Sequence, residues 1–130
     1  MHKLIADNQQ LTGTAAVSTS TIQVDGNRYH TLYVMYSPDT DSTNALQVTI
    51  EMSPDNVVWH PFTGAYSATT GTATEGAQIT LSLTSNGVAD QFHAPYTFTG
   101  AAQYLRVKLA ETNTPADFGN ASIWIFSSRA

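Results

Sequence analysis

Four histidines are the side chains of this chain that are best suited to proton transfer near neutral pH: His2, His30, His60 and His93. Nucleophilic catalysis needs such a histidine beside a Ser or Thr hydroxyl and oriented by a carboxylate. Hydroxyls are abundant, but the chain has no Gly-x-Ser-x-Gly nucleophile elbow. We therefore interpret the histidines as polar edge or turn residues and predict no catalytic residue and no enzyme activity.

Metal-binding patterns are weak. No histidine lies within four positions of another, which excludes the helical His-x-x-x-His zinc pattern. The loop 37–44 places the oxygens of Asp39, Asp41 and Asn44 at a calcium-like spacing, but it lacks the glycine and the distal glutamate of an EF-hand. We predict a solvated loop and no metal or cofactor, with a structural Ca²⁺ in this loop as the alternative.

The acidic side chains do not suggest glycoside hydrolysis, which needs two carboxylates at a set distance, one of them with a raised pKa. Most of Glu51, Glu75, Glu111 and the seven Asp residues fall in predicted loops, and nothing in the sequence suggests that they are buried. Arg106 and Lys108 form a small basic spot on one strand face. We predict that they pair with Glu51 across a sheet.

The elements that position these side chains are strands. Leu46, Val48, Ile50 and Met52 alternate with polar residues, which is the two-residue period of a strand with one dry face. A polar turn follows at 53–56, and we predict a hairpin whose second strand delivers Trp59 to a core. Further strands are predicted at 17–24, 29–36, 78–83, 96–98, 103–110 and 121–126, with an Asp-Gly hairpin turn at 25–26 and one irregular helical turn within 86–93.

This spacing of short strands and turns predicts an all-β fold, an antiparallel β-sandwich or jelly-roll-like barrel of about eight strands with little or no helix. We divide the chain into an N-terminal arm, residues 1–16, and a single β-sandwich domain, residues 17–130. The arm is either an edge strand of the sheet or a segment that reaches onto another subunit.

Two of the strands are apolar on both faces. In 29–36 one face carries Leu32, Val34 and Tyr36, and in 121–126 one face carries Ile123 and Ile125. The opposite faces carry Tyr33 with Met35 and Trp124 with Phe126. A domain of this size seldom has enough chain to cover both faces of two strands, and large exposed apolar patches mark association sites. We predict that these four residues face a second sheet, a crossing loop or another subunit.

The amino-acid composition argues against two classes of partner, nucleic acids and membranes. The 130 residues suffice for one domain, and the formal charge of −5 disfavours nucleic acid. Only 12% of residues are charged, and no cysteine is present. No apolar run approaches the roughly 20 residues that span a bilayer, and residues 1–10 lack the features of a signal peptide. We expect no nucleic-acid or membrane partner.

Residues 46–126 resemble a recurrent β-sandwich pattern in which a strand ends in Ser-x-Asp-Gly/Asn-x-x-Trp and a later strand carries Tyr-Leu/Val-Arg-Val/Ile, here Ser-x-Asp-Asn-x-x-Trp and Tyr-Leu-Arg-Val. The matching positions are Ser53, Asp55, Trp59, Tyr104, Leu105 and Arg106. The pattern is similar to small structural proteins of tailed bacteriophages and, more weakly, to discoidin-type carbohydrate- or lipid-binding domains. Discoidin domains begin with an aromatic-rich segment that is absent here, so their binding residues are not transferred.

The resemblance and the composition together suggest a non-enzymatic virion structural protein, a capsid decoration or head/tail accessory protein. It would be a homo-oligomer that bridges major capsid or tail shell subunits in the virion. The alternative is a carbohydrate-binding β-sandwich module. A solvent-facing pair formed by Trp59 and Trp124 would favour that alternative, because exposed aromatic rings stack on sugars.

Overall fold

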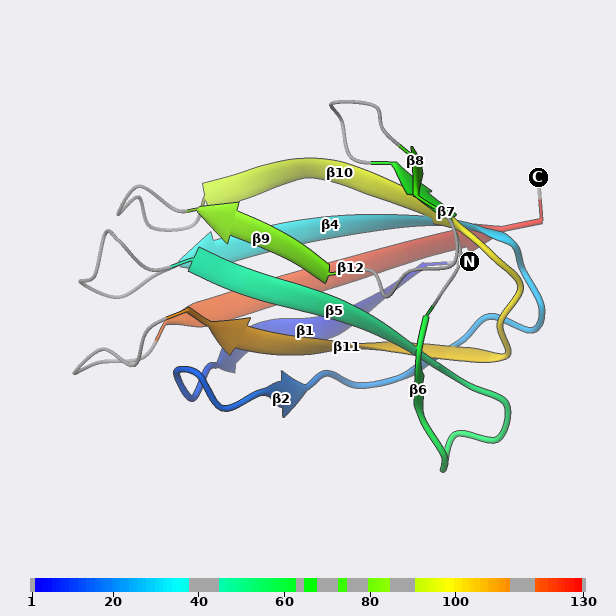
Figure 1. Cartoon of the computed structure of the whole chain (residues 1–130), viewed down its shortest axis with the longest axis horizontal. Helices are drawn as coiled ribbons and strands as arrows, with labels where there is room; N and C mark the ends of the chain where they lie inside the picture. Colours follow the sequence, from blue (N-terminus) through cyan, green and yellow to red (C-terminus); the bar gives the residue numbers. More distant parts are fainter. Residues whose placement is uncertain are drawn as a thin grey trace.

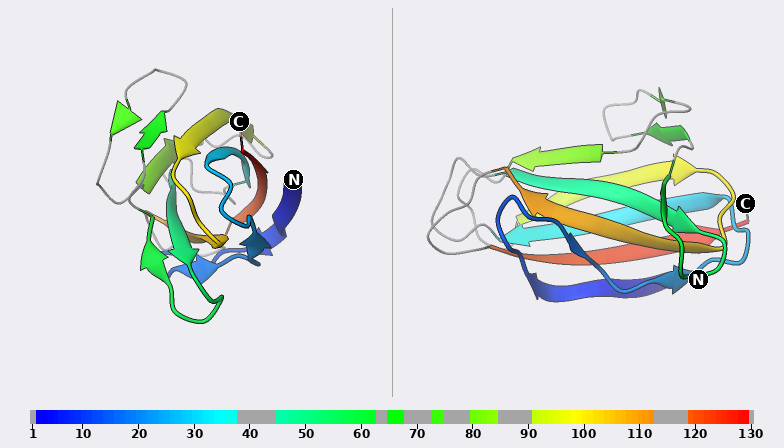
Figure 2. Two further views of the ribbon diagram at one scale, coloured as in Figure 1. Left: turned by 90° about the vertical axis from the view of Figure 1, so that its right-hand side faces the viewer. Right: turned by 60° about the horizontal axis from the view of Figure 1, so that its bottom comes forward.

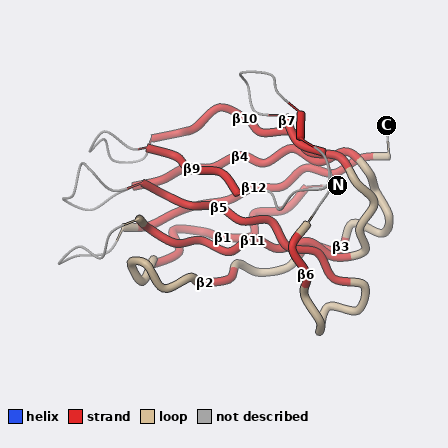
Figure 3. Tube along the Cα trace, in the orientation of Figure 1, coloured by secondary structure: helices blue, strands red, loops and turns tan. Residues whose placement is uncertain are grey.

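The computed structural model describes residues 2–37, 45–62, 65–67, 73–74, 80–84, 91–112 and 119–129, and every regular element in these ranges is a strand (Figures 1 and 3). The strands form two antiparallel sheets, which confirms the predicted all-β sandwich. The first sheet has the order β1 (His2–Gln10), β12 (Asn120–Ser128), β4 (Tyr29–Ser37), β10 (Gln91–Thr99), β7 (Ala65–Ser67) and β8 (Ala73–Thr74). The second sheet has the order β2 (Val17–Ser18), β11 (Tyr104–Glu111), β5 (Ala45–Ser53) and β6 (His60–Pro61), with β3 (Ile22–Gln23) also paired to β11 and β9 (Thr80–Thr84) to β5.

The core lies between the two sheets, which form two layers along the long axis of the molecule (Figure 2). Alternate residues of the long strands point into it, as the two-residue period predicts. Leu46, Val48 and Ile50 of β5 and Leu105, Val107 and Leu109 of β11 are fully buried, as are Leu32, Val34 and Tyr36 of β4 and Ile123 and Ile125 of β12. The inward faces of β4 and β12 are therefore used by the core, and their outward faces must be covered otherwise or remain at the surface.

The N-terminal segment is an edge strand, the first of the two alternatives for it. β1 pairs antiparallel with β12, with irregularities between Leu4 and Ala6 and between Ala6 and Gln9. Its outer side is tied to the segment between β2 and β3, because the amide of Ser20 donates to the Ile5 carbonyl at 2.9 Å and Lys3 Nζ donates to the Thr21 carbonyl at 2.8 Å. β1 thus closes one side of the sandwich.

Three local predictions are wrong. The turn at Asp25 and Gly26, both with positive φ, does not form a hairpin, because β3 belongs to the second sheet and β4 to the first. The turn instead connects β3 of the second sheet with β4 of the first. Residues 57–59 are not a strand, since the chain bends through 54–58 and β6 makes the pairing with β5. Residues 91–93, expected in a helical turn, lie in β10.

Some predictions fall outside the described residues. These are the cation-binding alternative at Asp39, Asp41 and Asn44, the position of Glu75, and residues 86–90 of the expected helical turn.

Candidate functional site

The outward faces of β1, β12 and β4 carry a continuous set of apolar and aromatic side chains, which we call the aromatic face: His2, Leu4, Tyr33, Met35, Trp124 and Phe126. Strand register brings these residues together. Tyr33 is opposite Trp124, and Trp124 is opposite Leu4, so one row crosses three strands. All four residues predicted for an interface, Tyr33, Met35, Trp124 and Phe126, therefore lie on this face. Whether a neighbouring subunit covers them stays a prediction.

Ring contacts hold the aromatic face together. The rings of Tyr33 and Phe126 meet edge to face with centroids 5.3 Å apart, and the imidazole of His2 stacks on Phe126 at 5.4 Å. Tyr33 remains 37% exposed, Leu4 38% and Phe126 41%, while Met35 and Trp124 are partly buried. The domain's own core does not enclose these side chains.

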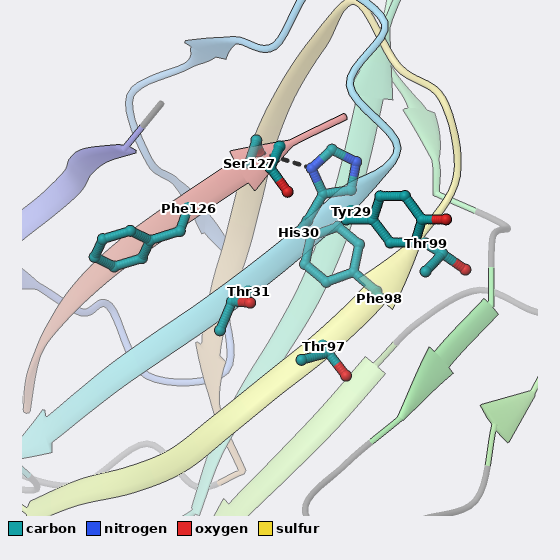
Figure 4. A pocket seen from close by; sticks show the side chains of 9 residues that line it. Tyr29, His30, Thr31, Thr97, Phe98, Thr99, Phe126 and Ser127 are labelled. Carbon is teal, nitrogen blue, oxygen red and sulfur yellow. Dashed lines mark hydrogen bonds between the residues drawn. The ribbon is translucent and has the colours of Figure 1, made fainter. Parts of the chain in front are cut away.

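One end of the same sheet face contains a shallow depression of about 440 Å³ (Figure 4). Its rim comes from outward-facing residues in two register rows, Thr99, Tyr29 and Ser128 in one and Thr97, Thr31 and Phe126 in the other. Three buried residues, His30, Phe98 and Ser127, lie behind it. We call this feature the end depression. It adjoins the aromatic face, and Phe126 belongs to both.

His30 is a buried residue, which corrects its interpretation as an edge or turn residue. Its Nδ1 lies 2.7 Å from Ser127 Oγ and its Nε2 lies 2.9 Å from the Gly100 carbonyl oxygen. A carbonyl only accepts, so Nε2 carries the proton and Nδ1 accepts from the serine hydroxyl. Burial lowers the pKa of His30, although its backbone hydrogen bonds oppose that shift. The imidazole is therefore neutral at pH 7.

The His30 and Ser127 pair resembles part of a hydrolytic triad but differs from one in two respects. A neutral carbonyl stands where a triad has its carboxylate. His30 and Ser127 are only 1% and 3% exposed, so a substrate does not reach the hydroxyl. The pair satisfies polar groups at the end of the core, where the His30 ring also stacks on Phe98 at 4.9 Å. Sequence reasoning missed it because the two residues are 97 positions apart.

The outward face of the second sheet carries the predicted ion pair. Arg106 Nε lies 2.9 Å from Glu51 Oε1, and Lys108 Nζ lies 3.8 Å from Glu51 Oε2. The Arg106 guanidinium also lies 4.2 Å from the centroid of the Trp59 ring, a cation–π contact. Trp59 is thus a partly buried outer-face residue and not the core residue predicted. Trp59 precedes β6 beside the outward face of the second sheet, whereas Trp124 is in β12 of the first sheet, so the two do not form a pair.

The residues of the Ser-x-Asp-Asn-x-x-Trp pattern form a turn. The Ser53 hydroxyl, on a residue that is 1% exposed, accepts from the Asn56 amide at 2.9 Å. Asp55 Oδ1 accepts from the amides of Val57 and Val58, each at 2.9 Å, and these hydrogen bonds lower the pKa of the Asp55 carboxyl. The turn sets the approach to Trp59, so in this chain the pattern maintains the fold.

Two acidic residues are buried, against the expectation from the sequence. Glu51 is 7% exposed and Glu111 is 1% exposed. Glu111 Oε2 accepts from the Tyr36 hydroxyl at 2.7 Å, and Oε1 accepts from the Gly119 amide at 3.2 Å. A carboxylate held in this way joins β4, β11 and the segment that leads into β12. Glu51 and Glu111 do not form a glycosidase-type carboxylate pair, because Glu51 is held in an ion pair with Arg106.

Within the described ranges, no group of three or more His, Asp or Glu residues is arranged to hold a metal ion. The described residues also include no helix with the length and apolar character needed to cross a membrane.

Comparisons with known proteins find only distant structural similarity. No protein-family model matches the sequence, and no curated protein matches it. A chain in the structure of infectious bursal disease virus Gt strain is similar over 96% of this chain, with 11% identity and a TM-score of 0.31, and this chain spans 39% of its length. The CBM35 from Cellvibrio japonicus Abf62 is similar over 97% of this chain and 93% of its own, with 12% identity and a TM-score of 0.30. At these TM-scores neither structure assigns a function to this chain.

Proposed function

We propose that the chain is a non-enzymatic virion structural protein, a capsid decoration or head/tail accessory protein that binds its neighbours through the aromatic face. One observation carries this proposal. Among the described residues, six large hydrophobic side chains are exposed: Leu4, Tyr29, Tyr33, Val57, Val58 and Phe126. Three of the six, Leu4, Tyr33 and Phe126, belong to the aromatic face, and Tyr29 lies beside it on the outward face of β4.

The concentration of apolar groups on this face is unusual for a surface sheet. The outward face of an antiparallel sheet that packs on one side is normally polar, as the second sheet is at Glu51, Arg106 and Lys108. Monomeric soluble proteins rarely expose contiguous apolar patches of more than a few hundred Å². Covering the aromatic face with another protein removes apolar area from water, which is worth roughly 25 cal/mol per Å² before the costs of association.

The virion assignment draws on the sequence as well. The Ser53 to Trp59 turn and the Tyr104-Leu105-Arg106 segment carry the resemblance to tailed-phage structural proteins. The chain is poor in charged residues and rich in Thr and Ser. In this proposal the partners are other copies of the chain and the major capsid or tail shell protein, and the place of action is the assembled particle. The contribution is mechanical, through added buried area between shell subunits.

The test is cryo-electron microscopy of particles that carry the chain, compared with particles from which its gene has been deleted. We expect additional density at the shell surface that contacts Leu4, Tyr33 and Trp124, and a lower temperature of shell disruption after the deletion. Particles carrying Trp124→Ser should lose the density, whereas Val57→Ser, on the exposed turn of the opposite sheet, should retain it. An aromatic face directed to solvent in the particle, or unchanged particles after deletion, would overturn the proposal.

A further inference from the structure

The end depression has a chemical character different from the rest of the aromatic face. Its rim combines two exposed aromatic rings, Tyr29 at 48% and Phe126 at 41%, with the hydroxyl side chains Thr31, Thr97, Thr99 and Ser128. Figure 4 shows Phe126 and Tyr29 on either side of Thr31, on the neighbouring strands β12 and β4. No charged side chain is among the residues that line it.

From this lining we infer that the end depression is a binding site for a neutral saccharide. A sugar ring presents a C–H surface that packs on an aromatic ring, and hydroxyls around its edge that need hydrogen-bond partners. The volume of about 440 Å³ lies within the usual range for small-molecule sites, and its shallow form suits one or two sugar rings at the end of a chain.

Strand register sets the spacing of the site. Tyr29 and Phe126 occupy diagonal positions on paired strands, which in an antiparallel sheet are about 7–8 Å apart. Thr31 lies directly opposite Phe126, and Thr99 lies directly opposite Tyr29. Each ring is thus paired with a hydroxyl on the adjacent strand. Within the described part of the chain, the hydroxyls of Thr31 and Thr99 make no hydrogen bond to protein, so both are available to a ligand.

The surroundings favour an uncharged ligand. Behind the rim, His30 is neutral, because burial lowers its pKa and both ring nitrogens have partners in Ser127 and Gly100. The chain as a whole carries a formal charge of −5, which repels acidic sugars. The site therefore contains no cation to pair with a carboxylate or sulfate group, and a neutral hexose or N-acetylhexosamine fits its chemistry.

The saccharide site does not rest on the virion proposal. The association proposed above depends most on one row of the aromatic face, formed by Leu4, Trp124 and Tyr33. This row lies next to the Phe126 row, on the side away from Tyr29. The first row of the depression, Thr99, Tyr29 and Ser128, is two residues farther along each strand. Substitutions at Tyr29 and Thr99 therefore test sugar binding, and substitutions at Leu4 and Trp124 test association.

The experiment is a nuclear magnetic resonance titration of the full chain with the methyl glycosides of glucose, galactose, mannose and N-acetylglucosamine, and with sialyllactose as an acidic probe. We expect at least one neutral glycoside to shift the amide resonances of Tyr29, Thr31 and Thr99 with a Kd in the millimolar range. Tyr29→Ala should weaken that binding at least tenfold, which corresponds to about 1.4 kcal/mol. Thr99→Val, which keeps the side-chain shape, should weaken it several-fold.

Two control variants keep the result interpretable. Met35→Ala, on the aromatic face but outside the depression, and Val57→Ala, on the opposite sheet, should bind the glycoside as the wild type does. The inference is overturned if no neutral glycoside shifts these resonances at tens of millimolar, if the shifts map to the Trp59 and Arg106 face, or if sialyllactose binds more tightly than the neutral sugars. Equal affinity of folded Tyr29→Ala and wild type would also overturn it.

Discussion

Replacing Tyr33 with serine tests whether the aromatic face holds copies of this chain together. The Tyr33 side chain is 37% exposed, and a large aromatic side chain can bury about 200 Å², so roughly 75 Å² of it remains for a neighbour to cover. At about 25 cal/mol per Å² this area is worth about 2 kcal/mol per copy. In a twofold dimer both copies lose it, so we expect Tyr33→Ser to weaken association by about 4 kcal/mol, or about a thousandfold in Kd.

The assay is sedimentation velocity of wild type and variant over a wide range of concentrations. The substitution also removes the edge-to-face contact with Phe126, and loss of this ring pair should lower the free energy of unfolding of the single subunit by about 0.5–1.5 kcal/mol. Circular dichroism establishes that the variant is folded at the temperature used. Val57→Ser is the matched control, because Val57 is 77% exposed on the opposite sheet and its loss should leave association unchanged. A wild type that stays monomeric throughout the micromolar range, or a Tyr33→Ser variant that associates as tightly as wild type, would refute the reasoning.

Three further predictions concern stability, measured by urea unfolding. Tyr36→Phe removes the 2.7 Å hydrogen bond to buried Glu111 and should lower the free energy of unfolding by about 1.5–3 kcal/mol. Tyr33→Phe, the matched control at an exposed residue, should lower it by less than about 0.5 kcal/mol, and equal losses would contradict this prediction. Burial lowers the pKa of His30, so as the pH falls the unfolded chain binds a proton at this imidazole before the folded chain does. The free energy of unfolding should therefore decrease as the pH falls below about 6.5, and His30→Gln should flatten that slope. The amides of the turn lower the pKa of Asp55, so the free energy of unfolding should decrease a second time as the pH falls below about 4, and this decrease should be absent in Asp55→Asn. An unchanged pH dependence in His30→Gln or in Asp55→Asn would contradict the role assigned to that residue.

The parts of this fold that sequence could predict are those governed by local periodicity. Alternation in 46–52 identified the buried face of β5, and apolar residues on both faces of 29–36 and 121–126 identified the outward face that the structure leaves at the surface. The Glu51 ion pair with Arg106 and Lys108 was also predictable, because all three positions have the outward parity of their strands. In each case a two-residue period decides the direction of the side chain.

The parts that sequence could not predict depend on partners distant along the chain. His30 is buried because Ser127 and Gly100 satisfy both of its ring nitrogens, and Glu111 is buried because Tyr36 and the Gly119 amide satisfy its carboxylate. Trp59 is held at the surface of the second sheet by the Arg106 guanidinium. No local pattern encodes such pairings, so a burial rule based on residue type alone fails at these positions.

The placement of the two chain ends has a practical consequence. Both ends lie at the same end of the sandwich, where Ser128 borders the depression and His2 stacks on Phe126 (Figure 1). An affinity tag fused at the C-terminus would therefore crowd the sugar site, and one fused at the N-terminus would lie over the aromatic rings. Protein for either binding assay should have its tag cleaved, or should carry the label on the Val57 turn of the opposite sheet.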